Sequence, residues 1–205
     1  MFYCFLADGF EETEALAPVD ILRRADIPVT TVGVTGEVVT SSHHVPVTAD
    51  MTIDEFEIDD EIRGVILPGG MPGVNNLYAN ETVKEAVSFC AAHDLFVCAI
   101  CAAPSIPGRM GLLEGKKATC FPGFEKYFIG AQALTDKTVT DGKFITAKGA
   151  GCALDFGFAI VSAVEARRRR LRSPPRCSAD ESRESRFVRE SLSARFLQGT
   201  PRTAR

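Results

Sequence analysis

The stretch Leu95–Gly108, LFVCAICAAPSIPG, decides the fold that we expect for this chain. Residues 95–100 form an unbroken apolar run of strand length, which is typical of a central parallel strand covered on both faces. The run stops at Cys101, and Pro104 can open a helix because amides in the first helical turn have no intrahelical partner. Cys101 would then lie at a corner between strand and helix. Open α/β sheets bind ligands at such corners, and the amino end of the helix favours an anion such as a thiolate.

Strands and helices alternate through the rest of the chain. Further buried strands are expected at residues 1–6, 28–35 and 64–67, and helices at about 11–24, 80–93 and 152–165. Asn80 is a good N-cap for the second of these helices. The alternation predicts an α/β sandwich with a mainly parallel central sheet.

Two short hairpins interrupt this alternation. Residues 37–48 predict a two-stranded excursion whose turn exposes His43 and His44. The pair Asp141-Gly142 lies between β-rich runs within residues 138–147, which is a good signal for a two-residue hairpin turn. Between the hairpins, residues 121–130 are expected to form a loop with at most one helical turn.

Length and composition indicate one cytoplasmic domain. With 205 residues and 45% hydrophobic content, the chain can bury one good core. No run approaches the roughly 18 apolar residues of a membrane span, and the opening MFYCFLADGFEE passes straight from a strand to acidic residues, unlike a secretory signal. The seven cysteines are scattered through the sequence. This usage fits a reducing cytoplasm better than a disulfide framework.

The charge changes abruptly near Ala166. Residues 166–205 hold 12 Arg, no Lys and 4 acidic residues, whereas the remainder holds 11 basic and 23 acidic residues. We therefore expect a folded domain over residues 1–165 and a largely disordered, solvated tail over residues 166–205. The acidic body lacks the electrostatic footprint of a nucleic-acid-binding protein, so RNA or an acidic partner is an alternative for the basic tail alone.

Cys98 and Cys101 spell a CxxC pair, which in a cytosolic α/β protein suggests a redox disulfide. Three residues of strand span about 10 Å, however, which is too far for a disulfide whose Cα atoms lie about 5.5 Å apart. We therefore expect Cys98 to be a core residue. No second Cys/His pair follows at ligand spacing, so no metal site is expected.

The loops after two other strands should approach Cys101, because the carboxyl ends of parallel neighbours meet at one edge of the sheet. Gly69 and Gly70 follow the strand at residues 64–67, and glycine lets backbone amides come close to an oxyanion. An ordinary turn fits the same spacing. The loop after the first strand carries three carboxylates, any one of which could point at the thiol: Glu11, Glu12 and Glu14.

Four ordered segments resemble the ThiJ/PfpI superfamily, specifically its Parkinsonism-associated deglycase branch, often called DJ-one. They are ADGFEETEALAPVDILRRA (7–25), VILPGGMPGVNNL (65–77), AICAAPSIPGRMGLLEGKKAT (99–119) and ITAKGAGCALDFGFAIVSAVE (145–165). The resemblance implies a flavodoxin-like three-layer sandwich with a nucleophile elbow, usually assembled as a homodimer. It also implies Cys101 as the nucleophile, Glu14 as its carboxylate partner, and the backbone near Gly70 and Ala102 as an oxyanion site.

Three departures from the residue patterns of related proteins narrow the possible chemistry. Ala102 stands where the protease-like branch places a histidine, so a Cys-His protease is disfavoured. No histidine follows His93, although class I glutamine amidotransferases need one. Phe121 replaces a histidine of some deglycase-branch members, so Glu14 or water would have to move the proton. A protonated Glu14 could donate a hydrogen bond to the Cys101 thiolate and thereby lower the pKa of the thiol.

These residues and the resemblance predict a cofactor-free glyoxalase or deglycase. It would convert methylglyoxal-like dicarbonyls, or their early adducts, to hydroxy acids through a covalent adduct on Cys101. The alternative is a redox-sensing or chaperone-like stress protein in which Cys101 oxidises to sulfinic acid. A low thiol pKa and access to solvent favour such oxidation, so the enzymatic and sensing functions need not exclude each other.

Overall fold

The computed structural model describes residues 1–172 of the chain. The strands are β1 (Phe2–Leu6), β2 (Val29–Gly33), β3 (Val38–Thr40), β4 (Pro46–Thr48), β5 (Met51–Thr52), β6 (Gly64–Leu67), β7 (Phe96–Ile100), β8 (Lys117–Ala118), β9 (Gln132–Ala133), β10 (Thr138–Asp141) and β11 (Phe144–Ala147). The helices are α1 (Glu12–Arg24), η1 (Ile53–Glu55), α2 (Gly73–Ala79), α3 (Glu81–Ala92), α4 (Ser105–Arg109), η2 (Glu125–Tyr127), η3 (Ala150–Cys152) and α5 (Ala153–Arg172).

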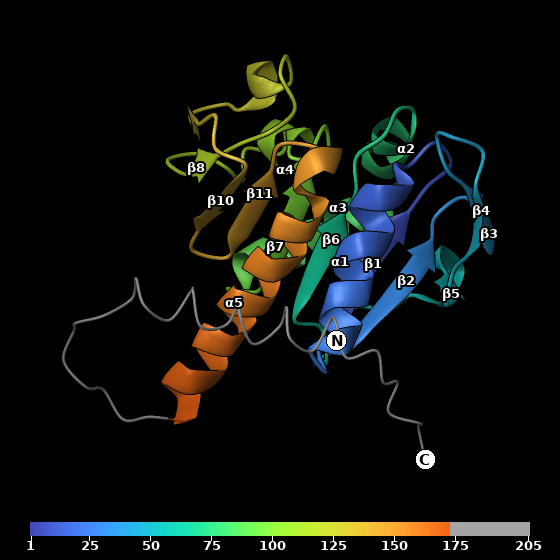
Figure 1. Cartoon of the computed structure of the whole chain (residues 1–205), viewed down its shortest axis with the longest axis horizontal. Coiled ribbons are helices and arrows are strands. Elements are labelled where there is room, and N and C mark those ends of the chain that lie inside the picture. The colour runs from blue at the N-terminus through green and yellow to red at the C-terminus, as the bar shows by residue number, and fades with distance from the viewer. Residues whose placement is uncertain (173–205) are drawn as a thin grey trace.

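A seven-stranded sheet forms the centre of the molecule, in the order β10-β11-β7-β6-β1-β2-β5 (Figure 1). All neighbouring strands in it run parallel except β10, which pairs antiparallel with β11. The three central strands lie side by side, so Cys4 of β1 pairs with Ile66 of β6, which pairs with Cys98 of β7. The mainly parallel sheet predicted from the sequence is confirmed.

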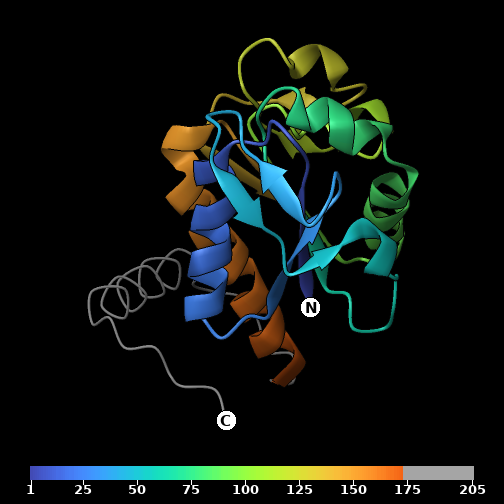
Figure 2. The same ribbon diagram turned by 90° about the vertical axis from the view of Figure 1, so that its right-hand side faces the viewer.

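Helices cover both faces of this sheet and complete the three-layer, flavodoxin-like sandwich (Figure 2). Successive residues of a strand point to opposite faces. Cys4 and Leu6 of β1 therefore join the core beneath α1 and α5. Tyr3 and Phe5 join the second core, beneath α2, α3 and α4. Both faces of the central strands are buried, which explains their continuous apolar runs.

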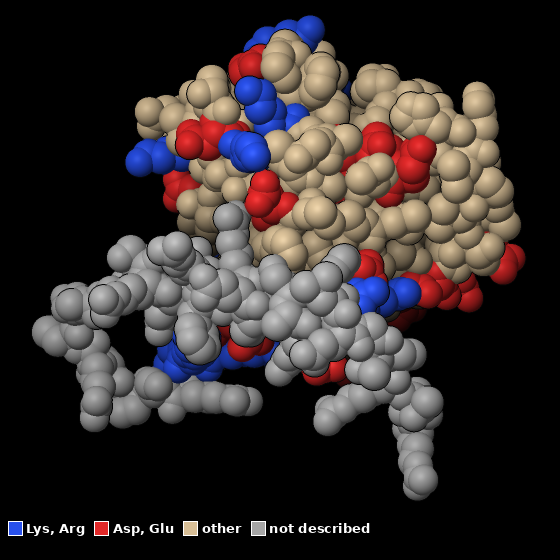
Figure 3. Space-filling view, viewed as in Figure 1, with Lys and Arg blue, Asp and Glu red and all other residues tan. Residues whose placement is uncertain are grey.

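The last helix is longer than predicted. It was expected to end near Glu165 but continues to Arg172, so residues 166–172 are helical and not part of a disordered tail. Some Lys and Arg side chains lie near the end of this helix, and others are spread over the upper part of the same face (Figure 3). The remaining tail residues, 173–205, lie outside the described residues. None of the helices within residues 1–172 combines the length and apolar character that crossing a bilayer requires.

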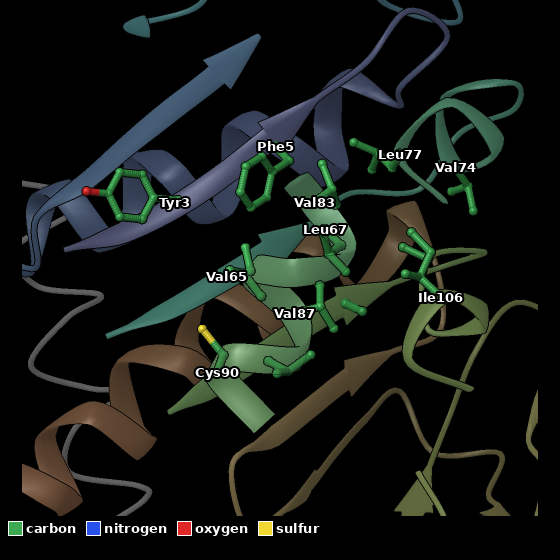
Figure 4. Close-up of a cluster of buried hydrophobic side chains, with 14 of the residues drawn as sticks. Tyr3, Phe5, Val65, Leu67, Val74, Leu77, Val83, Val87, Cys90 and Ile106 are labelled. Carbon is green, nitrogen blue, oxygen red and sulfur yellow. The ribbon is translucent and has the colours of Figure 1, made fainter. Parts of the chain in front are cut away.

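The core beneath α3 shows how helix and sheet interlock (Figure 4). Val83, Val87 and Cys90 recur at helical spacing along α3 and are fully buried. They pack in one cluster with Val65 and Leu67 of β6. As predicted, Asn80 caps this helix, because its side chain accepts a hydrogen bond from the Val83 backbone N–H.

Of the remaining local features, two hairpins and one helical turn were predicted and one helix was not. The hairpins β3–β4 and β10–β11 form as predicted, and His43 and His44 are exposed in the first turn. η2 supplies the single helical turn expected within residues 121–130. α2 was not predicted from the sequence, because Gly73, Asn75 and Asn76 are poor helix formers and the preceding Pro-Gly-Gly-Met-Pro run indicates a loop. Tertiary packing holds this short helix, since Val74 and Leu77 are buried against the sheet.

Substitution of Ile160 tests how much the core beneath α5 contributes to the free energy of unfolding. Its side chain is 0% exposed, whereas Ile129 is 64% exposed. Ile160→Ala should lower the free energy of unfolding by about 2–5 kcal/mol, because it leaves a cavity between α5 and the sheet. Ile129→Ala, with the same change in side-chain chemistry, should change it by less than about 0.5 kcal/mol. Urea unfolding measures both values, and equal losses would show that α5 is not docked as described.

Candidate active site

Cys101 occupies a strained turn directly after β7. Its φ is 63°, a left-handed conformation that is uncommon for residues other than glycine and costs about 1–3 kcal/mol. Two hydrogen bonds hold it there: the Cys101 N–H donates to the Ala147 carbonyl at 2.9 Å, and the Phe121 N–H donates to the Cys101 carbonyl at 2.8 Å. This is the geometry of a nucleophile elbow, which presents the side chain at the end of the sheet.

The helix after the elbow is shorter than the sequence suggested. Residues 102–104 form turns, and α4 covers only Ser105–Arg109. The groups that face the sulfur are instead two backbone N–H groups, those of Gly70 and Ala102. These are the two positions at which the resemblance implies an oxyanion site.

Glu14 is a buried carboxyl beside this elbow. It lies in the first turn of α1 and is 1% exposed. Glu11 caps the helix by accepting the Glu14 backbone N–H at 2.6 Å, which fixes the direction of the first turn. The Glu14 side chain accepts a hydrogen bond from the Gly69 N–H at 3.0 Å. Of the three carboxylates left open by the sequence, Glu14 is therefore the one that reaches the site.

Gly69 lies against both Glu14 and Cys101, and only glycine fits there. A Cβ at Gly69 would lie 2.3 Å from Glu14 Oε2, 2.6 Å from Cys101 Cβ and 3.1 Å from its Sγ. Gly70 has a φ of 90° and is equally confined, because a Cβ there would lie 2.4 Å from the Glu11 backbone nitrogen. The two glycines let the loop after β6 pass between α1 and the elbow.

Glu14 and Cys101 form a hydrogen-bonded pair that titrates as a unit. Burial raises the pKa of Glu14 to about 7, although hydrogen bonds from Cys101 and Gly69 oppose the rise. Burial and the neighbouring Glu14 carboxylate raise the pKa of the Cys101 thiol to about 12. The N–H groups that face the sulfur lower the same pKa. Because two adjacent anions repel, a thiolate near neutral pH requires that Glu14 hold the shared proton.

The remaining cysteines within residues 1–172 are buried and free. Cys98 is 0% exposed and belongs to the core beneath α1 and α5, as predicted from strand geometry. Burial raises the pKa of its thiol well above the ordinary value. Cys101 is the one cysteine of this part of the chain with partial exposure.

Phe121 and Gly149 line the site beside Glu14. A Cβ at Gly149 would lie 3.5 Å from the Phe121 ring and 3.9 Å from Glu14 Oε1. Phe121 was predicted to stand in the place of a histidine, whereas Gly149 was not predicted to belong to the site. The available signal was positional, since Gly149 follows β11, the parallel neighbour of β7, and so lies at the same edge of the sheet.

One group of three metal-ligating side chains occurs within residues 1–172. Ligand atoms of Glu11, Glu12 and His43 lie within 4.8 Å of one another. An ion pair accounts for much of this proximity, because His43 Nδ1 lies 2.9 Å from Glu12 Oε1 and the imidazole is largely exposed. Glu11 is already engaged as the cap of α1. We assign no ion to this cluster.

A three-layer α/β sandwich with a cysteine elbow beside a buried carboxyl defines a recognisable class of proteins, and comparison with known sequences specifies the family. The profile of the DJ-1/PfpI family matches residues 2–163. Protein dj-1beta of Drosophila melanogaster is 34% identical over 158 residues, which cover 76% of this chain and 84% of that protein. The Parkinson disease protein 7 homolog of Danio rerio is 34% identical over 163 residues, 76% of this chain and 85% of that protein.

Solved structures agree with the sequence relatives. A DJ-1 superfamily protein from Salmonella typhimurium superposes with a TM-score of 0.78 and 30% identity, over 94% of this chain and 97% of that one. Drosophila DJ-1beta superposes with a TM-score of 0.77 and 28% identity. Not every relative matches along its length: this chain spans 36% of DJ-1 homolog B from Arabidopsis thaliana, with 35% identity over 159 residues. The chain belongs to the DJ-1/PfpI family.

The raised pKa of Glu14 predicts a pH-dependent stability. In the unfolded chain the carboxyl ionises near pH 4.3, whereas in the fold it ionises near pH 7. The folded state therefore binds more protons between these values, and the stabilising contribution, complete below about pH 4.3, is lost as pH rises through 7. Glu14→Gln removes the titration, so the wild type should lose stability relative to this variant between pH 5 and 8, on the order of 1–3 kcal/mol.

Urea unfolding at a series of pH values measures the difference. Glu12→Gln is the matched control on the same turn, because it leaves the buried pair intact. Parallel stability curves for wild type and Glu14→Gln would contradict the raised pKa.

Proposed function

We propose that this protein converts small dicarbonyls such as methylglyoxal to hydroxy acids, with Cys101 as the nucleophile and Glu14 as the proton carrier. The observation that carries the proposal is the hydrogen-bonded pair of these side chains, buried beside two N–H groups that converge on the sulfur. A nucleophile, a proton carrier and oxyanion donors are the groups that addition to a carbonyl requires.

The reactive form of the pair is the one in which Glu14 holds the proton and Cys101 is a thiolate. The raised pKa of the thiol makes this the minor form of the singly protonated pair. The sulfur attacks the aldehyde carbon, a C–S bond forms, and the carbonyl electrons move to an oxygen that the N–H groups of Gly70 and Ala102 stabilise. Glu14 protonates this oxygen, giving a hemithioacetal. The Glu14 carboxylate then removes the proton from the former aldehyde carbon, which gives an enediolate, and the hydroxyl proton passes to the oxygen of the adjacent carbon. Glu14 returns the carbon-bound proton to that adjacent carbon, which leaves a thioester.

Water hydrolyses the thioester, releases the hydroxy acid and regenerates the Cys101–Glu14 pair with one proton. The sum is addition of one water to the dicarbonyl, with an internal transfer of hydrogen between its two carbons. No external oxidant or reductant enters the balance. Early dicarbonyl adducts on amines would pass through the same covalent intermediate.

The structure favours this scheme over a Cys-His protease. Ala102 follows the nucleophile directly, as the sequence shows. The His43 side chain pairs with Glu12, and the His93 ring lies 2.9 Å from the Phe89 carbonyl oxygen at the end of α3. Neither imidazole is partnered with Cys101, so proton transfer falls to Glu14.

A second candidate function is redox sensing through Cys101. The observation that favours it is selective access: within residues 1–172, Cys101 is partly exposed while the other cysteines are buried. Exposure and thiolate character govern oxidation to sulfinic acid. A solved structure of Toxoplasma gondii DJ-1 is described as oxidized, and it superposes on this chain with a TM-score of 0.78 and 25% identity. The homodimer and the cytoplasmic location implied above stay predictions.

Lactate formation from methylglyoxal tests the enzyme directly. Cys101→Ala should lower kcat/KM by at least about a hundredfold, because it removes the nucleophile, and Glu14→Gln by about 10²–10⁴-fold. Cys90→Ala is the matched control, since Cys90 is buried on α3 in the opposite core. Lactate at the wild-type rate from Cys101→Ala would exclude the proposal. Peroxide-dependent gain of two oxygens at Cys101, in a wild type without turnover, would support the sensor instead.

Phe121→His tests whether the missing base limits turnover. The Phe121 backbone is fixed to Cys101 by a 2.8 Å hydrogen bond, so an imidazole there would lie beside the elbow. We expect kcat to rise by about tenfold or more, the lower range of general acid–base catalysis. Phe124→His, three residues further along the same loop, should leave kcat within about twofold. A slower Phe121→His enzyme with unchanged folding would show that the aromatic ring itself serves the reaction.

A further inference from the structure

The Arg109 guanidinium lies over the rings of two tyrosines that come from different segments. Arg109 is the last residue of α4. Its Cζ atom lies 3.9 Å from the ring centre of Tyr127 in η2 and 4.8 Å from that of Tyr78 in α2. Both distances fall within the range of a cation–π interaction, which favours arginine and strengthens where water is excluded. One side chain therefore links three segments that are far apart in the sequence.

No carboxylate within residues 1–172 competes for this guanidinium. The ion pairs of this part of the chain do not include Arg109. Its Nε atom is buried and has no hydrogen-bond partner among the described residues. Guanidinium groups stack readily on aromatic faces, because they are planar and more weakly hydrated than ammonium groups. The two tyrosine rings therefore supply the attraction that holds this charge in place.

The three linked segments are the ones that surround the nucleophile. α4 follows the elbow at Cys101, and α2 follows the loop that contains Gly69 and Gly70. η2 lies in the loop that begins at Phe121, which lines the site beside Glu14. Arg109 thus contacts the continuation of every loop that meets at the sulfur except the one after β1.

Close packing brings α4 against both of its partners. Ile106 of α4 lies in one buried cluster with Val74 and Leu77 of α2 (Figure 4). Toward η2, a Cβ at Gly108 would lie 2.6 Å from the Tyr127 carbonyl oxygen, so only glycine lets the two segments come this close. The residues before Arg109 therefore place its side chain at the junction of the three segments.

A chain of backbone hydrogen bonds leads from Tyr127 to the elbow. The Tyr127 N–H donates to the Phe124 carbonyl at 3.1 Å, and the Phe124 N–H donates to the Phe121 carbonyl at 3.1 Å. The Phe121 N–H donates in turn to the Cys101 carbonyl at 2.8 Å, which is one of the two bonds that hold the strained elbow. A displacement of the Tyr127 ring would therefore reach Cys101 through three short steps.

We propose that Arg109 is a positioning residue for the nucleophile. It holds the loop from Phe121 against α4, and this loop keeps Cys101 in its strained conformation. Without the guanidinium the elbow would relax and turn the sulfur away from the two backbone N–H groups that face it. These N–H groups stabilise a thiolate, so the thiol would become a weaker acid. As a role in catalysis this rests on the proposed function, whereas the effect on the thiol does not.

The rate at which iodoacetamide alkylates Cys101 in the full chain, between about pH 6 and 10, tests the proposal. Mass spectrometry of the peptide that carries Cys101 keeps Cys177, which lies outside the described residues, from contributing. Arg109→Gln and Tyr127→Leu should each move the pH dependence upward by about half a unit, which lowers the rate at a given pH by about threefold. Tyr127→Phe keeps the aromatic face and should retain the wild-type profile.

Lys126→Gln is the matched control for charge. The Lys126 Nζ lies 5.2 Å from the centre of the same Tyr127 ring, but Lys126 belongs to η2 itself and so cannot link it to α4. Its pH dependence should equal that of the wild type. Arg109→Gln and Tyr127→Leu combined should move the profile no further than either alone, because both remove the same contact.

An unmoved pH dependence in both Arg109→Gln and Tyr127→Leu, whatever the absolute rates, would overturn the proposal. So would equal shifts in Tyr127→Leu and Tyr127→Phe, or a shift of the same size in Lys126→Gln. If Arg109→Gln fails to fold, the comparison of Tyr127→Leu with Tyr127→Phe still decides the question. Alkylation needs no turnover of methylglyoxal, so a wild type that forms no lactate but shows these shifts would contradict the proposed function alone.

Discussion

The contact between Glu14 and Cys101 across Gly69 is the constraint on which the rest of the site depends. Two acids in contact where one of them is fully buried do not readily both ionise, so they share a proton, and its position decides whether the sulfur is a nucleophile. Gly69 must lack a side chain, since a Cβ there would lie 2.3 Å from the Glu14 carboxylate. The loop after β6 therefore contributes to the site in two ways. It has no side chain at Gly69, and it donates one backbone N–H to Glu14.

The sheet order creates this contact. β1, β6 and β7 are adjacent and parallel, so the loops that follow them emerge at one edge and carry Glu14, Gly69 and Cys101 respectively. Burial of the strands on both faces fixes their separation and direction. Backbone hydrogen bonds with Ala147 and Phe121 stabilise the strained, left-handed backbone conformation of Cys101. A rigid sheet with three convergent loops thus positions groups that lie far apart in the sequence.

Much of this arrangement is readable from the sequence, because it follows from local patterns. Apolar runs predict the central strands, and the break at Cys101 predicts the elbow. Other features depend on packing between distant segments and leave little local signal. The short α2 is held by buried Val74 and Leu77, despite a sequence that reads as a loop. The choice of Glu14 among three neighbouring carboxylates requires the direction of the first helical turn, which the Glu11 cap sets. Composition predicted a disordered tail from residue 166, but residues 166–172 continue α5, and Arg167 donates a hydrogen bond to the Asp94 carbonyl.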